Sequence, residues 1–345
     1  MRPGIAMAAS NNKIRLGHGS GGRLSRELVD KVFLKYFADK ELARLDDAAA
    51  LKTAFSRLAF TTDSYVVSPL FFPGADIGRL AVCGTVNDLS VKGAIPKWLS
   101  AAFILEEGLP FETLERVCAS MRAAAIEAGV AIVTGDTKVV EKGKADGLFI
   151  STAGVGEIPP GVDLSSAYAR KGDAVIVSGA LGAHGLAVLN ARHGLGLKGA
   201  IKSDAAPLNK LAAAVLKACP RAHVMRDLTR GGLAGALVEI AESSGVKIEI
   251  EAEAVPVERQ VRAAAAILGL DPLYSANEGR LVCFAPAQDS EKIVRAMRAD
   301  PNGKGSAVIG FVVGACAGGA VLLRTEVGGV RKLALAEGEQ LPRIC

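Results

Sequence analysis

The sequence lacks the features that mark several large classes of protein. Aromatic residues make up only 5% of the 345 positions, and no segment clusters five or more basic residues, so a net charge of +5 is too dispersed for a nucleic-acid-binding surface. The six cysteines form no CxxC pair, and the four histidines form no HxxxH pair. This spacing excludes the usual zinc sites and disulfide frameworks.

Signals for membrane insertion or export are also missing. Residues 1–10 contain one basic residue and no apolar run, unlike a signal peptide, so we expect a cytoplasmic, reducing location. Residues 305–323 carry no charge, but five glycines interrupt them. Because Gly318-Gly319 separates two runs rich in β-branched residues, we predict two strands there and no membrane helix.

Two common catalytic motifs are absent as well. The chain contains neither the GxSxG motif of serine hydrolases nor the GxxxxGK[ST] loop of P-loop enzymes. Apolar residues at 50% and charged residues at 22% are nevertheless typical of a globular protein with a large core. Any catalytic chemistry must therefore come from motifs other than GxSxG and GxxxxGK[ST].

The length of the chain suggests two domains. Pro159-Pro160-Gly161 interrupts the pattern of strands and helices, and we place the boundary there. The predicted organisation is an N-terminal arm at 1–13, a first domain at 14–161, a second domain at 162–330 and a free, flexible tail at 331–345.

Helical and strand patterns follow one another without strict βαβ order. Helices are expected where apolar residues recur every three or four positions, at Arg23–Phe37, Asp76–Gly93, Phe111–Ala128, Ala206–Ala218, Thr229–Ser243, Val257–Leu268 and Asp289–Ala299. Strands are expected at Arg57–Val67, Lys97–Leu105, Val130–Val140, Leu148–Ile158, Asp173–Ser178, Val246–Glu251, Arg280–Phe284, Ala307–Val313 and Ala320–Arg324. This mixed order predicts two layered α+β domains, not one doubly wound sheet.

Short acidic motifs at the ends of predicted strands and turns indicate chemistry. They are Asp46-Asp47, Asp63, Asn87-Asp88, Asp136, Asp227 and Asn277-Glu278. A carboxylate within an apolar run is costly to bury alone, so Asp63 and Asp136 need a cation, hydrogen-bond donors or a metal. Several carboxylates together with a phosphate commonly hold Mg²⁺. The residues therefore favour a magnesium-nucleotide or phosphate enzyme, with helix caps, Asx turns or a solvent-facing Asp88 as the alternatives.

The two ends of the chain add further candidates. The glycine-rich segment 17–22 (GHGSGG) precedes a predicted helix, where backbone N–H groups suit an anion unless the segment is a plain loop. Cys345 is the last residue, and we expect its thiol to be exposed and favoured as the thiolate by Arg343. Seven extended residues from Gly338 reach about 23 Å, enough to carry a thiol to a partner, unless Cys345 is an incidental last residue.

Together these motifs resemble the HypE family of hydrogenase expression/formation proteins. The likeness runs through GHGSGGRLSRELV, DDAAAL, FTTDSYVVSPLFFPGADIGRLAVCGTVNDLSVKGA, GDTKVV, MRDLTRGGLAGALVEIA, YSANEGR and the terminal PRIC. The acidic motifs are similar to those of a superfamily that includes aminoimidazole ribonucleotide synthetase, selenophosphate synthetase and thiamine monophosphate kinase. The terminal PRIC singles out the HypE family within it.

The resemblance implies a PurM-like α+β fold of two domains, in a homodimer whose N-terminal domains pair strands into a β-barrel, with ATP in the cleft. It implies that the carbamoyltransferase HypF places a carbamoyl group on Cys345. The chain would then dehydrate this thiocarboxamide to a thiocyanate with ATP and Mg²⁺. The cyanide would pass to iron on a HypC–HypD complex during maturation of a nickel–iron hydrogenase.

The resemblance also implies roles for single residues. Cys345 would carry the substrate, and Lys138 and Glu278 would handle protons, with a plain salt bridge as the alternative for that pair. The carboxylates implied at the metal are Asp46, Asp47, Asp63, Asp88 and Asp136. The residues implied at the nucleotide are Gly19, Gly21, Gly22, Asp46, Asp63, Asn87, Asp88, Asp136 and Asp227.

Two other functions stay open on the sequence. A kinase or synthetase of the same superfamily, acting on a small free substrate, would not need Cys345. Its selenophosphate synthetase form carries a reactive cysteine or selenocysteine in the glycine-rich loop, and GHGSGG has none. A non-catalytic carbamoyl or cyanide carrier would need the tail but not the acidic motifs, so the presence of those motifs argues against it.

Overall fold

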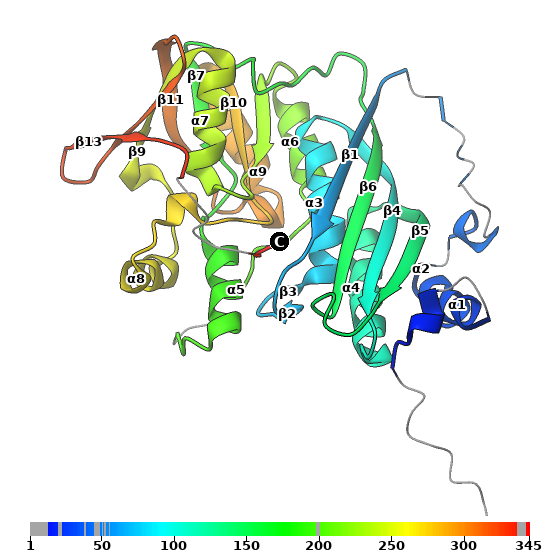
Figure 1. Ribbon diagram of the computed structural model, residues 1–345. Coiled ribbons are helices and arrows are strands. Elements are labelled where there is room, and N and C mark those ends of the chain that lie inside the picture. The colour runs from blue at the N-terminus through cyan, green and yellow to red at the C-terminus, as the bar shows by residue number, and fades with distance from the viewer. Residues whose placement is uncertain are drawn as a thin grey trace, which may run out of the picture.

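The chain folds into two α+β units, each with its own sheet and core (Figure 1). The computed structural model describes residues 13–19, 23–37, 39–44, 49, 51, 53–54, 56–197, 201–336 and 343–345. No helix within these ranges is long and apolar enough to cross a membrane. The expected two-domain α+β fold is confirmed, and the proposed boundary at Gly161 lies in the connection between the two sheets.

The N-terminal unit is built on a four-stranded sheet in the order β1-β6-β4-β5. Its strands are β1 (Leu58–Tyr65), β4 (Ile95–Glu106), β5 (Ala131–Val140) and β6 (Leu148–Glu157). Only the β4–β5 pair is parallel among them. A small hairpin of β2 (Phe71–Phe72) and β3 (Ala75–Asp76) leads into the first long helix.

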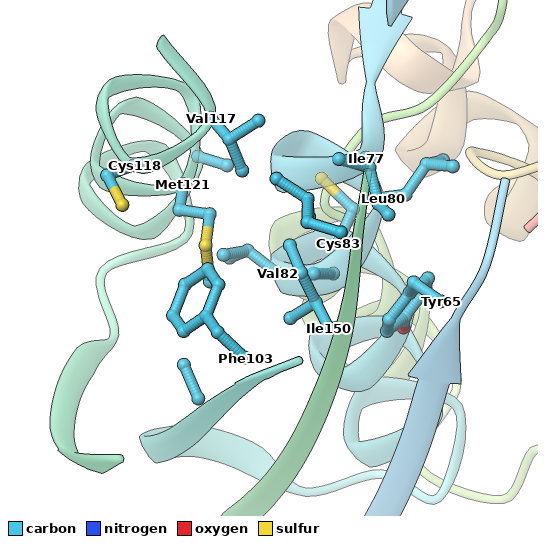
Figure 2. Packing of buried hydrophobic residues seen from close by; sticks show 14 of the residues in the cluster. Tyr65, Ile77, Leu80, Val82, Cys83, Phe103, Val117, Cys118, Met121 and Ile150 are labelled. Atoms are coloured by element: carbon cyan, nitrogen blue, oxygen red, sulfur yellow. The ribbon is translucent and has the colours of Figure 1, made fainter. Parts of the chain in front are cut away.

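Helices α3 (Ile77–Val91) and α4 (Phe111–Ala128) cover one face of this sheet (Figure 1). Figure 2 shows Val117 and Met121 of α4 meeting the side chains of α3 close to Phe103 of β4. A Cβ at Gly78 would overlap the carbonyl oxygen of Val117, so this glycine allows the two helices to pack closely. The side chain of Asp76 caps α3, which fixes where that helix begins.

The opposite face of the same sheet carries exposed apolar side chains. Successive residues of a strand point to opposite faces, so the residues that alternate with the core residues point to this second face, which we call the bare face. Leu58, Phe60, Ile95 and Ile104 are 53%, 73%, 46% and 43% exposed there. Short helices close the edge beside β5, namely the 3₁₀ turns Leu16–Gly19 and Leu42–Arg44, α1 (Arg23–Leu28), the π-helical Val29–Phe33 and α2 (Leu34–Phe37).

The C-terminal unit is built on a seven-stranded sheet in the order β13-β12-β9-β11-β7-β10-β8. Its strands are β7 (Asp173–Val177), β8 (Val224–Asp227), β9 (Val246–Glu251), β10 (Leu281–Pro286), β11 (Ala307–Ala315), β12 (Ala320–Arg324) and β13 (Val330–Leu333). Its helices are α5 (Ala183–His193), α6 (Asn209–Ala218), α7 (Gly232–Ser244), α8 (Arg259–Leu268) and α9 (Ser290–Arg298). Short 3₁₀ turns lie at Ala252–Ala254, Pro272–Tyr274, Ala287–Asp289 and Pro301–Gly303.

Alternate residues of the central strands explain how this sheet is covered on both faces. Val175 and Val177 of β7 pack into the cluster that contains α7, whereas Ala174 and Ile176 pack into the cluster that contains α6 and α9. The continuous apolar run of β7 is therefore that of a strand buried on both sides.

All the predicted helices and strands are present, with ends that shift by a few residues. The uncharged segment 305–323 forms β11 and most of β12, as expected. The sequence did not indicate β8, β13, the β2–β3 hairpin, the helix α5 or the π-helical turn within 23–37.

The prediction of a free tail at 331–345 is wrong for the residues that the structure describes. Val330–Leu333 pair with β12 as an edge strand. The last three residues, 343–345, are held between the two units (Figure 1), and Ile344 is 5% exposed within the N-terminal core. An aliphatic side chain gains free energy from such burial, and this favours a docked chain end over a free one.

Candidate active site

A cleft between the two units collects most of the predicted carboxylates. It encloses a cavity of about 530 Å³ lined by β1, α3 and the end of β8. Asp63 points from β1 toward α3, because its neighbours Thr62 and Ser64 take the bare face of the sheet. Asp88 comes from α3 and Asp227 from the last residue of β8. Three segments distant in sequence thus bring three carboxylates together.

Hydrogen bonds fix two of these carboxylates. Tyr65 donates its hydroxyl to Asp63 over 3.0 Å, and Thr61 donates to Asp88 over 2.7 Å. Thr61, Asp63 and Tyr65 occupy alternate positions of β1 and therefore point to the same face, toward the cleft. Tyr65 itself is buried, and burial together with nearby Asp63 raises the pKa of its hydroxyl. The hydroxyl accordingly stays protonated and acts as a donor.

Crowding of like charges perturbs the carboxylates of the cleft. Burial, and next the neighbouring Asp63, raises the pKa of Asp88. Burial, and next Asp88, raises the pKa of Asp227 to about 7. Such shifts mean that the ionised cluster is electrostatically unfavourable in the absence of a cation. A bound metal or a positively charged side chain would relieve this repulsion.

The donor set suits Mg²⁺ held jointly with phosphate. Hard carboxylate oxygens are the ligands that this ion prefers, and it is usually held by one or two carboxylates and substrate phosphates in place of a full protein cage. Among the described residues, no group of three or more His, Cys, Asp or Glu side chains is arranged to hold a metal by itself. Lys92 and Arg226 also line the cavity and supply positive charge for an anion.

Glu278 lies at the inner side of the same cluster and is 3% exposed. Its backbone N–H donates to Oδ1 of Asp204 over 3.0 Å, and its carbonyl oxygen accepts from the Asn87 amide over 3.2 Å. Burial, and next the nearby Asp227 and Asp204, raises the pKa of Glu278 well above its usual value. This direction favours the acid form of the carboxyl group and suits a proton-handling role, which stays a prediction.

Two asparagines of the acidic motifs form hydrogen bonds with backbone groups. Asn87 is 1% exposed, and its amide donates to the carbonyl oxygens of Ala206 and Glu278 while its oxygen accepts from Leu208 N–H. Asn277 accepts from Gly182 N–H over 2.8 Å. Asn87 thus joins the two units, and its predicted contact with nucleotide stays a prediction.

Asp136 and Lys138 lie elsewhere in the same chain. Both side chains are largely exposed and form an ion pair of 2.8 Å, which lowers the pKa of Asp136. Strand register places Asp63 opposite Thr152, Thr152 opposite Ala101, and Ala101 opposite Gly135. Three interstrand steps separate β1 from β5, about 14 Å.

Asp136 also occupies the other face of the sheet. It lies opposite Ala102, in phase with the exposed Ile104 of the bare face. Asp63 and Asp136 therefore do not meet at one metal within a single chain. Lys138 contacts Asp136, and its predicted proton-handling role beside Glu278 stays a prediction.

The glycine-rich loop lies beside Asp136 and Lys138. Gly19 and His18 line a cavity of about 280 Å³ that continues into the apolar space between the short N-terminal helices and β5. A Cβ at Gly19 would come within 2.6 Å of the Val139 backbone nitrogen, so the loop approaches the strand as only glycine permits. The predicted residues Gly21, Gly22, Asp46 and Asp47 lie outside the described part of the chain.

The C-terminus docks beside the end of β1. Val66 N–H, directly after β1, donates to the terminal oxygen of Cys345 over 3.0 Å. Cys345 is half-buried, whereas the sequence predicted that it would be exposed. The guanidinium of Arg343 binds Asp146 over 2.9 Å and the carbonyl oxygen of Val66 over 3.0 Å, and its expected effect on the thiol stays a prediction.

Four residues of this arrangement had no sequence signal that we could have used. His184, Ser203 and Arg192 contact the docked tail or its anchor, and Asp204 contacts Glu278. None of them stands in a motif with chemical meaning, and they become neighbours only through the packing of the two units. An alternating strand or an amphipathic helix can be predicted from one segment, but a contact of this kind cannot.

This architecture defines the class of the protein. Family models match at residues 45–158 with the N-terminal domain, and at 170–322 with the C-terminal domain, of AIR synthase related proteins. Within that class, the chain is 52% identical to the carbamoyl dehydratase HypE of Rhodobacter capsulatus, across 98% of this chain and 100% of the relative. The chain belongs to the HypE family of carbamoyl dehydratases.

Solved structures agree with this assignment. A crystal structure of the hydrogenase maturation protein HypE in complex with ATP is 49% identical, with a TM-score of 0.92 across 96% of this chain and 99% of the other. A crystal structure of a HypE–HypF complex is 44% identical, with a TM-score of 0.79 across 90% and 99% of the two chains. The fold described above is therefore that of a known ATP-binding enzyme family.

Proposed function

We propose that this chain dehydrates a thiocarboxamide carried on its own Cys345 to a thiocyanate, using ATP, and so supplies cyanide for iron in a nickel–iron hydrogenase. The observation that carries this proposal is the position of the chain end. Cys345 is held by Val66 N–H at the end of β1, the strand whose Asp63 and Tyr65 point into the carboxylate cleft. The chain end that carries the thiol is thereby anchored to the strand that supplies Asp63 to the cleft.

The chemistry explains why ATP is needed. Direct dehydration of R–S–C(=O)NH₂ would expel hydroxide, a poor leaving group. Transfer of the γ-phosphoryl group to the carbonyl oxygen, with loss of one N–H proton, gives an imidate-type phosphate ester and ADP. Loss of the second N–H proton then forms the C≡N bond as the C–O bond breaks and phosphate departs.

Residues of the cleft suit the two stages. Asp63, Asp88 and Asp227 would hold Mg²⁺ together with the triphosphate, and the ion would supply charge neutralisation for the transferred phosphoryl group. Burial and the neighbouring carboxylates raise the pKa of Glu278 well above its usual value, which favours its acid form. One oxygen of its acid form would donate a proton to the departing phosphate oxygen while the other oxygen accepts the remaining N–H proton, so the carboxyl group ends the step in its acid form.

A second copy of the chain would complete the nucleotide site. Asp136 and Lys138 occupy the bare, partly apolar face of the N-terminal sheet, where Phe60 alone is 73% exposed. Pairing of two such faces buries these apolar side chains and places each Asp136 next to the partner. This proposal, a homodimer joined through its N-terminal sheets, is tested by light scattering at micromolar concentration, where a monomer mass would contradict it.

Partners follow from the same reaction. HypF would carbamoylate Cys345, and a HypC–HypD complex would receive the cyanide, all within the cytoplasm. Cys345→Ala tests the assignment because the modified group has no other attachment point. The variant should retain its fold and ATP binding and form no thiocyanate, measured by intact mass. Thiocyanate on any other cysteine of the variant would contradict the proposal.

A further inference from the structure

His184 has a buried side chain that takes no part in the proposed reaction. It lies in the first turn of α5 and has no exposed surface. Its Nε2 lies 2.7 Å from the carbonyl oxygen of Ile344, and its Nδ1 lies 2.8 Å from Oγ of Ser203. The imidazole therefore bridges the second-last residue of the chain and the segment that precedes Asp204.

The hydrogen-bond partners fix the protonation of this ring. A carbonyl oxygen only accepts, so Nε2 must carry the proton that is donated to Ile344. Oγ of Ser203 already accepts from Ala205 N–H over 3.1 Å, so its hydroxyl proton is free to be donated to Nδ1. Burial lowers the pKa of His184 and keeps the ring neutral. The Ser203 hydroxyl thus selects the tautomer that binds the tail.

The ring is also fixed by its packing. Phe72, from the β2–β3 hairpin of the N-terminal unit, meets His184 edge-to-face with 5.6 Å between ring centres. Ser203 N–H donates to the carbonyl oxygen of Pro73 over 2.8 Å, which ties the 203–204 segment to the same hairpin. The imidazole therefore has one orientation, and Ile344 has to meet it there.

Asp204, next in the chain, connects this bridge to the acid of the cleft. Its Oδ1 accepts Glu278 N–H over 3.0 Å. A Cβ at Gly279 would overlap the carbonyl oxygen of Asp204, so the two backbones lie in direct contact. Ile344, His184, Ser203, Asp204 and Glu278 consequently form one continuous set of contacts from the chain end to the catalytic acid.

We propose that His184 is a positioning residue that holds the terminal dipeptide in the docked state, so that the group on Cys345 is presented to Glu278. This inference rests on the proposed function. The same hydrogen bond opposes release of the tail, which a partner must reach in order to modify Cys345. Loss of the Nε2 donor should therefore slow dehydration and speed outside access to the thiol, two effects of opposite sign.

Matched substitutions separate this role from general packing. His184→Gln keeps an N–H donor at the reach of Nε2, whereas His184→Asn keeps a polar group near Ser203 but is too short to reach Ile344. His193→Gln, on an exposed position of the same helix, is the control. If His184→Asn does not fold, His184→Met takes its place, because it preserves side-chain volume without either hydrogen bond.

The experiment measures the rate at which N-ethylmaleimide labels Cys345 in the full-length protein without ATP, located by mass of the C-terminal peptide. We expect labelling to accelerate about three- to tenfold in His184→Asn, the factor that one lost hydrogen bond provides, and to change less than about twofold in His184→Gln and His193→Gln. Single-turnover dehydration of the carbamoylated protein should slow in His184→Asn alone.

Equal labelling rates in His184→Asn and in the unchanged protein would overturn the inference, as would faster labelling in His184→Gln to the same extent. These outcomes do not depend on the reaction. If the unchanged carbamoylated protein fails to lose water with magnesium and ATP, the proposed function is wrong, while the labelling comparison still decides whether His184 holds the tail.

Discussion

Replacement of Glu278 by glutamine tests whether this residue transfers protons and the aspartates of the cleft bind Mg-ATP. The substitution is nearly isosteric, and the hydrogen bonds that hold this residue run through its backbone N–H and carbonyl oxygen, which are unchanged. Burial and the neighbouring carboxylates raise the pKa of the wild-type side chain, which favours its uncharged form. Glutamine matches the shape of that form and carries no charge, so we expect the unfolding free energy to change by less than about 1 kcal/mol.

The effects on binding and on chemistry should then separate. Asp63, Asp88 and Asp227 stay in place, so Mg-ATP affinity should be unchanged. Glutamine cannot donate or accept the proton as a carboxyl group does, and removal of a positioned acid–base group slows a reaction about 10²–10⁴-fold. Calorimetric titration with Mg-ATP and single-turnover dehydration on the same preparation measure the two quantities.

Glu242→Gln, at an exposed position of α7, is the matched control and should leave both quantities unchanged. A fall in ATP affinity that parallels the fall in rate would place Glu278 among the metal ligands. An unchanged rate would remove it from the reaction altogether. Either result refutes the role derived from its burial and its neighbours.

Three further predictions concern charge and domain contact. Burial raises the pKa of Asp227 from 3.8 to about 7, so between these pH values the folded state binds more protons than the unfolded state, and the unfolding free energy falls as pH rises. The substitution Asp227→Asn should flatten that fall and give a higher Tm than wild type at pH 8, measured by calorimetry at pH 5 and pH 8. Asp88→Asn should weaken Mg-ATP binding and phosphoryl transfer together, measured by titration, whereas Asp30→Asn on the exposed surface of the N-terminal helices should change neither. Asn87→Ala removes the amide that binds buried backbone groups of the C-terminal unit and should lower unfolding free energy by about 1–3 kcal/mol in urea denaturation, an effect that an unchanged denaturation midpoint would contradict.

Much of the fold could be predicted because the determining signals are local. The strands β4 and β6 were predicted from their own segments, and the apolar stripe of 111–128 followed by Gly129 predicted α4 with its end. The strand β8 was missed because its four residues, VMRD, are too short to show a period. The helix α5 was missed because its glycine and two histidines weaken an already mixed pattern.

The candidate site was predicted in part. Carboxylates within apolar runs indicated Asp63, and the cleft indeed groups it with Asp88, Asp227 and Glu278. The sequence could not show that Asp136 takes the opposite face of the sheet from Asp63, because this depends on strand order and register between distant segments. Nor could it show that the tail docks, since the anchors at Val66 and His184 lie in segments without a motif.

The most direct test of the central claim is the intact mass of the carbamoylated protein before and after addition of magnesium and ATP. The account predicts that the mass falls by one water, that the change is confined to the peptide ending in Cys345, and that it fails without ATP. ATP hydrolysis with the carbamoylated mass unchanged would contradict it.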